Sequence, residues 1–336
     1  MVIVDLVVML LLIVVAAEIF TNALEHLGER LGISEGVTGS LFAAVGTAMP
    51  ESLVPILAIF WGTENQQVNH EIGVGAILGA PLMLSTLAMC LMGIAVVRER
   101  GLRGAMLPEP TGLTRDLDFF LLSFGIASLA LFIPFREGYL AIVLATMGGS
   151  LVLVYFIYVM LTLRVSAQLV QNGHGTEAHR PLVLCYLRLP DAMVVIFVQL
   201  LLGLALLIAG AEGFIHAVAV TAREFDISAL LLSLLIVPIA TELPEKVNSI
   251  LWIRRRKDTL AFGNIAGAMV FQGSILPAIG ILFTPWQLRS EVLVVVLVTY
   301  AAALWLSCAL LWGHLRVWML FVSGGLYVAY LTIMLL

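Results

Sequence analysis

The chain has 336 residues, of which 61% are hydrophobic and only 12% are charged, and its mean hydropathy is +1.08. Since about a quarter of the residues of an average soluble domain are charged, this composition excludes an ordinary soluble protein and indicates several membrane spans. The net charge of −5 gives no support for nucleic-acid binding. The three cysteines, at positions 90, 185 and 308, are odd in number and far apart, so they predict no disulfide framework.

Apolar runs, each about long enough to cross a bilayer as a helix, follow one another along the chain. The ten runs are 3–28, 33–62, 71–97, 117–135, 138–163, 192–222, 227–253, 259–284, 290–312 and 315–336. All are expected to be helical, because a helix satisfies its own backbone groups in lipid. The first run has no basic segment before it, so we expect a span rather than a cleavable signal peptide.

A polar linker divides the runs into two groups of five. The predicted units are a first five-helix repeat over 1–163, a cytoplasmic linker over 164–191 and a second repeat over 192–336. The linker is expected to be a solvated connector. The basic residues predict its side of the membrane.

Most Lys and Arg residues fall in alternate loops, which are the inner loops if the N-terminus is outside. They are Arg30, Arg98, Arg100, Arg103, Arg115, Arg164, Arg180, Arg188, Arg254, Arg255, Arg256, Lys257 and Arg316. The outer loops then hold only Arg136, Arg223 and Arg289, and Lys246 lies within a span. This asymmetry predicts a multi-pass protein of the plasma (inner) membrane with both termini outside.

Two parts of the chain repeat each other at a constant offset of 194 residues. The matched pairs include Glu18 with Glu212, Thr47 with Thr241, Pro50 with Pro244 and Glu51 with Glu245, and Gly75 and Gly79 match Gly263 and Gly267 a little further on. Five spans separate the copies, an odd number, so the halves are expected to have opposite orientations. Inverted repeats are a transporter architecture with the binding site at mid-membrane.

The repeated acidic stretches offer a set of oxygen ligands. Proline within a helix frees the carbonyl four residues earlier, which predicts free carbonyls at Gly46 and Ala240. Thr47 lies one helical turn before Glu51, and Thr241 one turn before Glu245. Together the halves would supply about six oxygens, a set suited to calcium. The alternative is a pair of proline kinks whose glutamates are satisfied by neighbouring helices.

The second copy adds two charged residues. Glu242 and Lys246 are four apart in the order that favours a helical ion pair. Lys246 could simply neutralise Glu242, or it could act as a tethered cation in place of a bound sodium ion. For Glu18 and Glu212 we expect buried, structural hydrogen bonding. The glycine pairs are expected to let helices pack closely.

The repeated motifs resemble the two alpha repeats of the calcium/cation antiporter superfamily. The first is Gly46-Thr47-Ala48-Met49-Pro50-Glu51 followed by Gly75-x-x-x-Gly79, and the second is Ala240-Thr241-Glu242-Leu243-Pro244-Glu245 followed by Gly263-x-x-x-Gly267. The resemblance implies an all-α membrane protein of ten transmembrane helices in two inverted five-helix repeats, sodium/calcium exchanger-like. It also implies that Glu51 and Glu245 are central ligands, flanked by Thr47 and Thr241, and that the first and sixth spans slide across the others.

Several positions depart from the family pattern. A serine usually follows the threonine, where this chain has Ala48 and Glu242. The later motifs usually carry a serine and then an Asn or Asp four residues on. Here those positions are Ala80 and Leu84 in the first half and Ala268 and Gln272 in the second. Polar groups that the resemblance would assign to sodium are therefore missing, which favours protons as the counter-ion.

The predicted function is secondary active antiport of Ca²⁺ against H⁺ or Na⁺, by alternating access at a two-glutamate site. The predicted cation ligands are Gly46, Thr47, Glu51, Ala240, Thr241, Glu242, Glu245 and Gln272, with Lys246 as tethered cation or ion-pair partner. We expect no cofactor and no obligate protein partner. The alternatives are a same-fold antiporter for Na⁺/H⁺ or Mg²⁺, and a non-transporting relative with a degraded site. An intramembrane hydrolase using Glu242 and Glu245 is disfavoured, because no nucleophile or histidine accompanies them.

Overall fold

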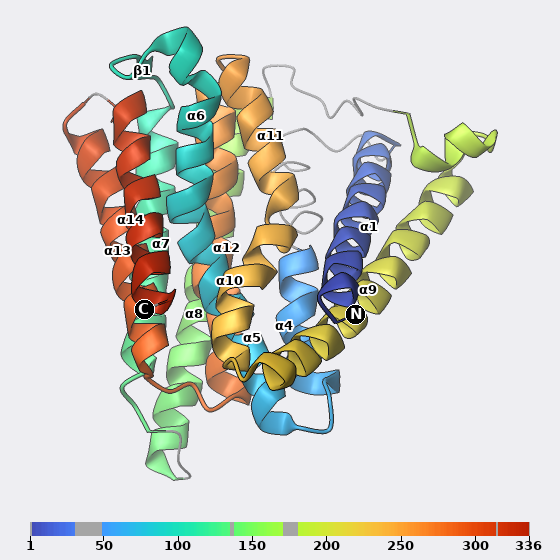
Figure 1. The fold of residues 1–336 in the computed structure, drawn as a ribbon. Coiled ribbons are helices and arrows are strands. Elements are labelled where there is room, and N and C mark those ends of the chain that lie inside the picture. The colour runs from blue at the N-terminus through green and yellow to red at the C-terminus, as the bar shows by residue number, and fades with distance from the viewer. Residues whose placement is uncertain (1, 31–48, 135–137, 171–180, 314, 336) are drawn as a thin grey trace.

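The computed structural model describes residues 2–30, 49–134, 138–170, 181–313 and 315–335, and these are largely helical (Figure 1). Among them, seven helices are long and apolar enough to cross a membrane: Val4–Leu24, Gln66–Arg100, Tyr139–Thr162, Met193–Phe225, Asp258–Phe283, Ser290–Leu311 and Val317–Leu335. Two shorter apolar helices cover Glu51–Trp61 and Ala229–Pro238.

The elements before the linker are α1 (Val2–Arg30), α4 (Met49–Trp61), α5 (Gln66–Met83), the π-helical turn η2 (Leu84–Ala88), α6 (Met89–Arg100), β1 (Ala105–Met106), α7 (Pro110–Ala130) and α8 (Tyr139–Val170). The later elements are the 3₁₀ turn η3 (Val183–Leu187), α9 (Met193–Phe225), α10 (Ala229–Thr241), α11 (Leu243–Arg254), α12 (Asp258–Phe283), α13 (Ser290–Leu311), β2 (Leu315–Arg316) and α14 (Val317–Leu335).

Two of the predicted runs differ from the helices observed, and a third lies partly outside the described residues. The run 227–253 is two helices, because α10 ends at Thr241 and α11 starts at Leu243. Of the run 33–62 only α4 lies within the described residues. The predicted run 117–135 begins earlier, at Pro110, because the Glu109 side chain caps α7 by accepting hydrogen bonds from the amides of Thr111 and Gly112.

Pro81 lies within the long helical segment from Gln66 to Arg100 without ending it. Just after Pro81 the backbone hydrogen-bonding pattern changes from α-helical to π-helical in the turn η2. At the start of this turn the Leu84 amide donates to the carbonyls of Ala80 and Pro81. Ser85 adds a side-chain hydrogen bond to the carbonyl of Leu82. A single π turn is a common way for a helix to absorb such an interruption.

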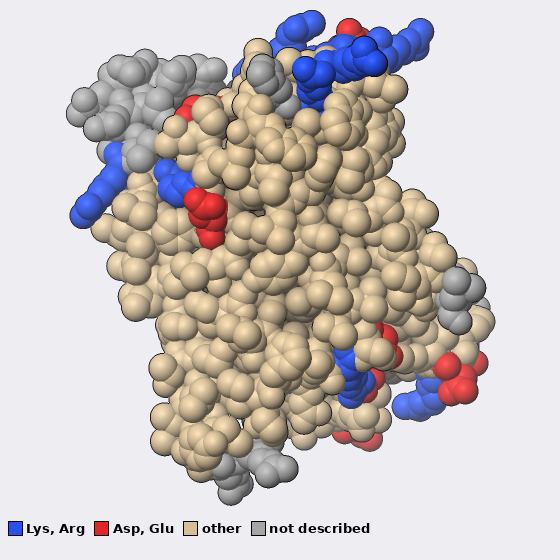
Figure 2. All heavy atoms as spheres, turned by 90° about the vertical axis from the view of Figure 1, so that its left-hand side faces the viewer, with Lys and Arg blue, Asp and Glu red and all other residues tan. Residues whose placement is uncertain are grey.

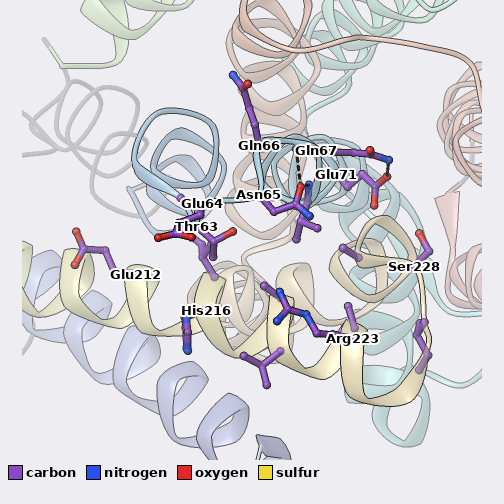
Figure 3. A pocket seen from close by; sticks show the side chains of 18 of the residues that line it. Thr63, Glu64, Asn65, Gln66, Gln67, Glu71, Glu212, His216, Arg223 and Ser228 are labelled. Atoms are coloured by element: carbon purple, nitrogen blue, oxygen red, sulfur yellow. Dashed lines mark hydrogen bonds between the residues drawn. The ribbon is translucent and has the colours of Figure 1, made fainter.

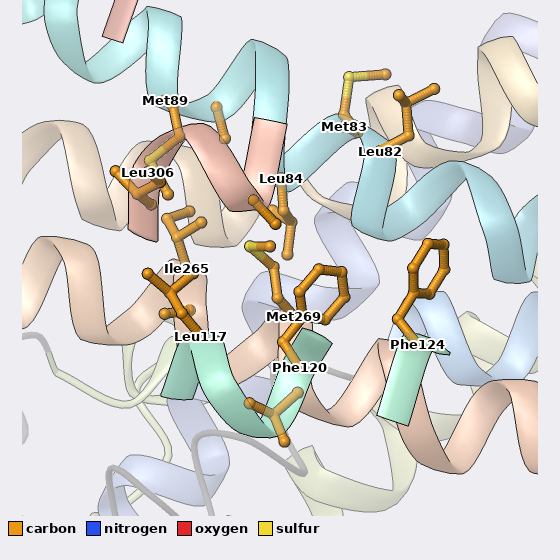
Figure 4. Close-up of a cluster of buried hydrophobic side chains, with 14 of the residues drawn as sticks. Leu82, Met83, Leu84, Met89, Leu117, Phe120, Phe124, Ile265, Met269 and Leu306 are labelled. Atoms are coloured by element: carbon orange, nitrogen blue, oxygen red, sulfur yellow. The ribbon is translucent and has the colours of Figure 1, made fainter. Parts of the chain in front are cut away.

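The buried side chains form two clusters. The larger cluster includes residues of α5, α6, α7, α12, α13 and α14, and Figure 4 shows its centre, where Phe120 of α7 lies beside Met269 of α12. The smaller cluster joins α1 and α9 to α4 and α10, with Ile13, Phe20 and Phe214 among its members. Figure 1 shows α1 and α9 side by side on one flank of the molecule. The fold is therefore a helix pair set against a larger helical body.

The glycine motif of α5 brings this helix very close to α10. A Cβ added to Gly75 would lie 2.7 Å from the Ser233 Cβ, and one added to Gly79 would lie 2.6 Å from the Pro238 Cγ and 2.7 Å from the Leu234 carbonyl oxygen. The Ser233 hydroxyl donates across the interface to the Ile72 carbonyl at 2.7 Å. The expected close packing is confirmed for this pair of glycines. It was wrong for the second pair, because a Cβ added to Gly263 meets no described atom within 4 Å and one added to Gly267 meets only the Tyr158 hydroxyl, at 3.5 Å.

The basic loops meet at one end of the molecule, called the basic end below. Figure 2 shows Lys and Arg side chains concentrated there. Strand β1 pairs with β2 in antiparallel register, Ala105 opposite Arg316, which ties the α6–α7 loop to the α13–α14 turn. A buried ion pair, Arg100 to Asp258 at 2.8 Å, joins the end of α6 to the start of α12. Loops far apart in sequence therefore share one side, as the positive-inside pattern predicts.

The described end of the linker is less solvated than predicted. The Asn22 Oδ1 of α1 accepts from the Val183 amide at 3.0 Å and from the Gln199 Nε2 of α9 at 2.8 Å. The Gln199 Oε1 accepts from the Leu184 amide at 2.9 Å. Because Leu182 and Leu184 are also buried, this part of the linker packs onto α1 and α9.

The contact between α5 and α10 predicts that Gly79→Ala destabilises the protein. The added methyl group has no room beside Pro238, so we expect the free energy of unfolding to fall by about 1–3 kcal/mol. Thermal unfolding in detergent measures the effect. The matched control is Gly149→Ala in α8, where an added Cβ meets no described atom within 4 Å. Equal unfolding temperatures for the two variants would contradict the expected clash.

Candidate cation site

The second acidic stretch lies at a break between two helices. Glu242 occupies the junction of α10 and α11, with φ −86° and ψ 4°. A proline kink was predicted here, but Pro244 lies in the first turn of α11, where no helical amide bond is required of it. The Ala240 carbonyl lies in the last turn of α10, a position where helical carbonyls lack intrahelical partners. It stays a predicted ligand.

The centre of the site is a buried amide shared by two carboxylates. Gln272 of α12 donates through Nε2 to the Glu51 Oε1 at 3.0 Å and to the Glu242 Oε1 at 2.6 Å. The three side chains are 0–2% exposed. Glu51 comes from α4 and Glu242 from the α10–α11 junction, so the amide joins acidic residues from the two repeated motifs.

This arrangement brings carboxylate oxygens from two helical elements close together. Both carboxylate oxygens lie one hydrogen bond from the same nitrogen, and two ligand oxygens of a bound Ca²⁺ can be up to about 5 Å apart. The Gln272 Oε1 is buried and has no hydrogen-bond partner among the described residues. Rotation of the amide by half a turn would bring Oε1 toward the carboxylates in place of Nε2. Gln272 can therefore donate hydrogen bonds to the two carboxylates, or offer an oxygen ligand to a cation bound between them.

The predicted ligands are only partly within the described residues. Thr241 is buried at the end of α10, where its hydroxyl donates to the Val237 carbonyl at 3.1 Å. Glu245 lies in α11, but its side chain is outside the described residues, as are Gly46 and Thr47. The predicted pairing of Glu51 with Glu245 is therefore untested, and the described pairing is Glu51 with Glu242 through Gln272.

Lys246 is buried on the same broken helix. Its ammonium group donates to the Pro238 carbonyl at 3.0 Å, and its amide donates to the Glu242 carbonyl at 3.2 Å. The Pro238 carbonyl also accepts from the Glu242 amide at 3.3 Å. The Pro238 carbonyl, near the helix break, therefore accepts a hydrogen bond from the cationic side chain of Lys246.

The walls of the site differ between the halves. Gln272 has Leu84 as its counterpart in the first half, and Leu84 is completely buried in the π-helical turn. The neighbouring counterpart Ala80 is also buried and apolar. At this pair of matched positions, the polar side chain therefore comes from α12. Among the described residues no group of three or more His, Cys, Asp or Glu side chains could hold a metal ion.

A cleft of about 1420 Å³ opens between α9 and the loop that joins α4 to α5. Figure 3 shows Glu212 and His216 of α9 along one side, with Glu64 and Asn65 of the loop across from them. Glu212 is exposed in this cleft, and Glu18 is exposed on α1. The expectation that these two glutamates are buried was wrong, because both side chains are exposed.

Buried acidic residues at a helix break, in a bundle of membrane-length helices, are typical of ion-transporting membrane proteins. The family model of the sodium/calcium exchanger protein matches residues 1–164 and 195–336, and the chain belongs to this family. It is a multi-pass membrane protein of the calcium/cation antiporter superfamily, a group of secondary transporters rather than enzymes.

Two curated relatives match most of the chain. A putative antiporter, CaxA, of Alkalimonas amylolytica is 27% identical over 288 residues, which cover 82% of this chain and 79% of the relative. The inner membrane protein YrbG of Escherichia coli (strain K12) is 25% identical over 283 residues, covering 84% and 80%.

Two solved structures share the fold. The H⁺/Ca²⁺ exchanger CAX has a TM-score of 0.74 at 19% identity, with 100% of this chain and 82% of that chain covered. The sodium-calcium exchanger NCX_Mj has a TM-score of 0.60 at 20% identity, with 99% of each chain covered. The sodium/calcium exchanger-like fold that the motifs predict is thereby confirmed.

The shared amide predicts that Gln272→Leu, which copies the first-half residue Leu84, destabilises the protein. Both buried carboxylates would lose a donor, so we expect the free energy of unfolding to fall by about 3 kcal/mol. Thermal unfolding without added divalent cations measures this loss. In the double variant Glu242→Gln with Gln272→Leu only one of the two side chains that lose this donor is still a carboxylate, and part of the stability should return. A single variant as stable as the parent would contradict the role of the amide.

Proposed function

We propose that this cation antiporter exchanges Ca²⁺ for protons or sodium ions at a mid-membrane site between its two halves. The observation that carries the proposal is the contact of Glu51 and Glu242 with one buried amide. Carboxylates inside a membrane protein are costly, and binding a transported cation between them offsets that cost. The proposed substrate is a divalent cation, with calcium first.

The proposed ligand set consists of the residues in the described contacts and of residues at matched positions of the sequence repeat. Glu51, Glu242 and Gln272 form the described part. Glu245 is the repeat counterpart of Glu51 and lies in the first turn of α11, so we propose it as a further ligand. The remaining proposed oxygens are the hydroxyls of Thr47 and Thr241 and the carbonyls of Gly46 and Ala240.

Protons are the favoured counter-ion. Leu84, Ala80 and Ala268 provide no oxygen ligand where the family pattern has polar side chains. Sodium requires several oxygen ligands of its own, whereas a proton requires only a carboxylate. The same apolar positions support one alternative, a relative whose site no longer transports. Transport of Na⁺ against H⁺, or of Mg²⁺, is a further alternative within the same fold.

The proposed cycle moves one part of the fold against the other. The smaller cluster joins α1 and α9 along their length, and the larger cluster holds most of the other helices. Sliding of the α1–α9 pair would open the site to one side at a time, and the cleft beside Glu212 would be the outer approach. The proposed topology is ten spans in two inverted repeats, in the inner membrane, with the basic end inside and both termini outside.

The proposal predicts that Glu51→Gln abolishes calcium flux. The change keeps the size of the side chain and one acceptor oxygen for the Gln272 amide but removes a charge from the proposed cation site, so we expect a loss on the order of a hundredfold or more. Proteoliposomes loaded with a calcium indicator and given a pH or sodium gradient measure the flux. The matched control is Glu99→Gln on the exposed end of α6. If Glu51→Gln transported calcium as the control does, the proposed site would be wrong.

A further inference from the structure

Lys246 is a cationic side chain placed beside the site by the break between α10 and α11. It is 4% exposed, and its Nζ lies 3.0 Å from the Pro238 carbonyl oxygen in the last turn of α10. The carbonyl end of a helix carries partial negative charge, which favours a cation there. The break therefore supplies a binding position for an ammonium group inside the membrane.

The ammonium-bearing residue is one helical turn from the carboxylates. Lys246 donates its amide to the carbonyl of Glu242, and the Glu242 carboxylate contacts Gln272, which also contacts Glu51. Lys246 thus belongs to the same buried group of residues as the proposed cation ligands. Its charge contributes to the electrostatic balance of that group.

Comparison of the two repeats shows that this pair of charged residues is present in the second half only. At the same offset of 194 residues, Lys246 corresponds to Ser52 and Glu242 corresponds to Ala48. Ser52 is buried too, so the lysine occupies a position that is inside the protein in both halves. The second half therefore carries one more carboxylate and one more ammonium group than the first.

Charge balance gives this difference a consequence for transport. Glu51, Glu242 and Glu245 together carry three negative charges when ionised, and uncompensated charge within a membrane is strongly unfavourable. One ammonium group leaves two negative charges, which match one divalent cation or two monovalent ones. Without the ammonium group, the three carboxylates would need three monovalent cations, so a third counter-ion would be exchanged in each transport cycle.

We infer that the Lys246 ammonium is a fixed monovalent cation of the transport site, which sets the exchange at two monovalent counter-ions for each divalent cation. The inference rests on the proposed function, since it concerns the same site. It differs from a purely structural ion pair between Lys246 and Glu242, because a structural pair would affect stability without changing the number of ions exchanged.

The test is the coupling ratio of wild-type protein and of Lys246→Ser, the residue of the first half. In proteoliposomes, calcium entry and counter-ion exit are measured together, with the gradient that drives the wild type. We expect about two counter-ions for each Ca²⁺ in the wild type and about three in Lys246→Ser, because the third carboxylate then needs its own cation. A wild-type ratio near three, or an unchanged ratio in the variant, would overturn the inference.

The double variant Glu242→Ala with Lys246→Ser makes the second half match Ala48 and Ser52. It removes the two charges together, so its ratio is expected to return to about two, whatever its rate. Three counter-ions for each Ca²⁺ in the double variant would also overturn the inference. The double variant therefore tests the inference even if Lys246→Ser alone fails to fold. Absence of calcium flux in the wild type would instead overturn the proposed function.

Discussion

The site depends on one buried hydrogen-bonding group, the amide of Gln272 between Glu51 and Glu242. Two carboxylates from different halves of the chain would repel each other in the low-dielectric interior, and the shared donor holds them together. The fold supplies the geometry. The break at Glu242 turns its carboxylate toward α12, and the close contact of α5 with α10 fixes the end of the broken helix. The cation site is therefore a property of the whole helix packing.

The two repeated halves of the sequence carry different side chains at matched positions. The first half presents Leu84 where the second presents Gln272, and Ser52 where the second presents Lys246. An inverted repeat in its symmetric form would offer equivalent ligands from both sides. Here the polar wall comes from α12 and the buried cation from α11. In the proposed site, this asymmetry means that the protein itself provides part of the positive charge that balances the carboxylates.

Much of this could be predicted from the sequence. The apolar runs and the repeated motifs predicted the sodium/calcium exchanger-like fold, which is confirmed. Glu51, Glu242 and Gln272, which the sequence nominated as cation ligands, lie together in the structure. The pairing of Glu51 with Glu242 could not be predicted, since it depends on a helix break that Pro244 only indicates. The exposure of Glu212 was also missed, because a cleft depends on how helices distant in sequence leave space between them. Local composition carries no such information.

The most direct test of the central claim is calcium-dependent stabilisation of the purified protein. Binding to the native state raises its stability by about 2.7 kcal/mol when the free cation is at 100 times its dissociation constant. Thermal unfolding is measured over increasing CaCl₂, at fixed ionic strength and pH, for the wild type and for Glu51→Gln. We predict that the unfolding temperature of the wild type rises with CaCl₂ and that the unfolding temperature of the variant does not change. Equal stabilisation of both proteins, or none in either, would contradict a calcium site at Glu51.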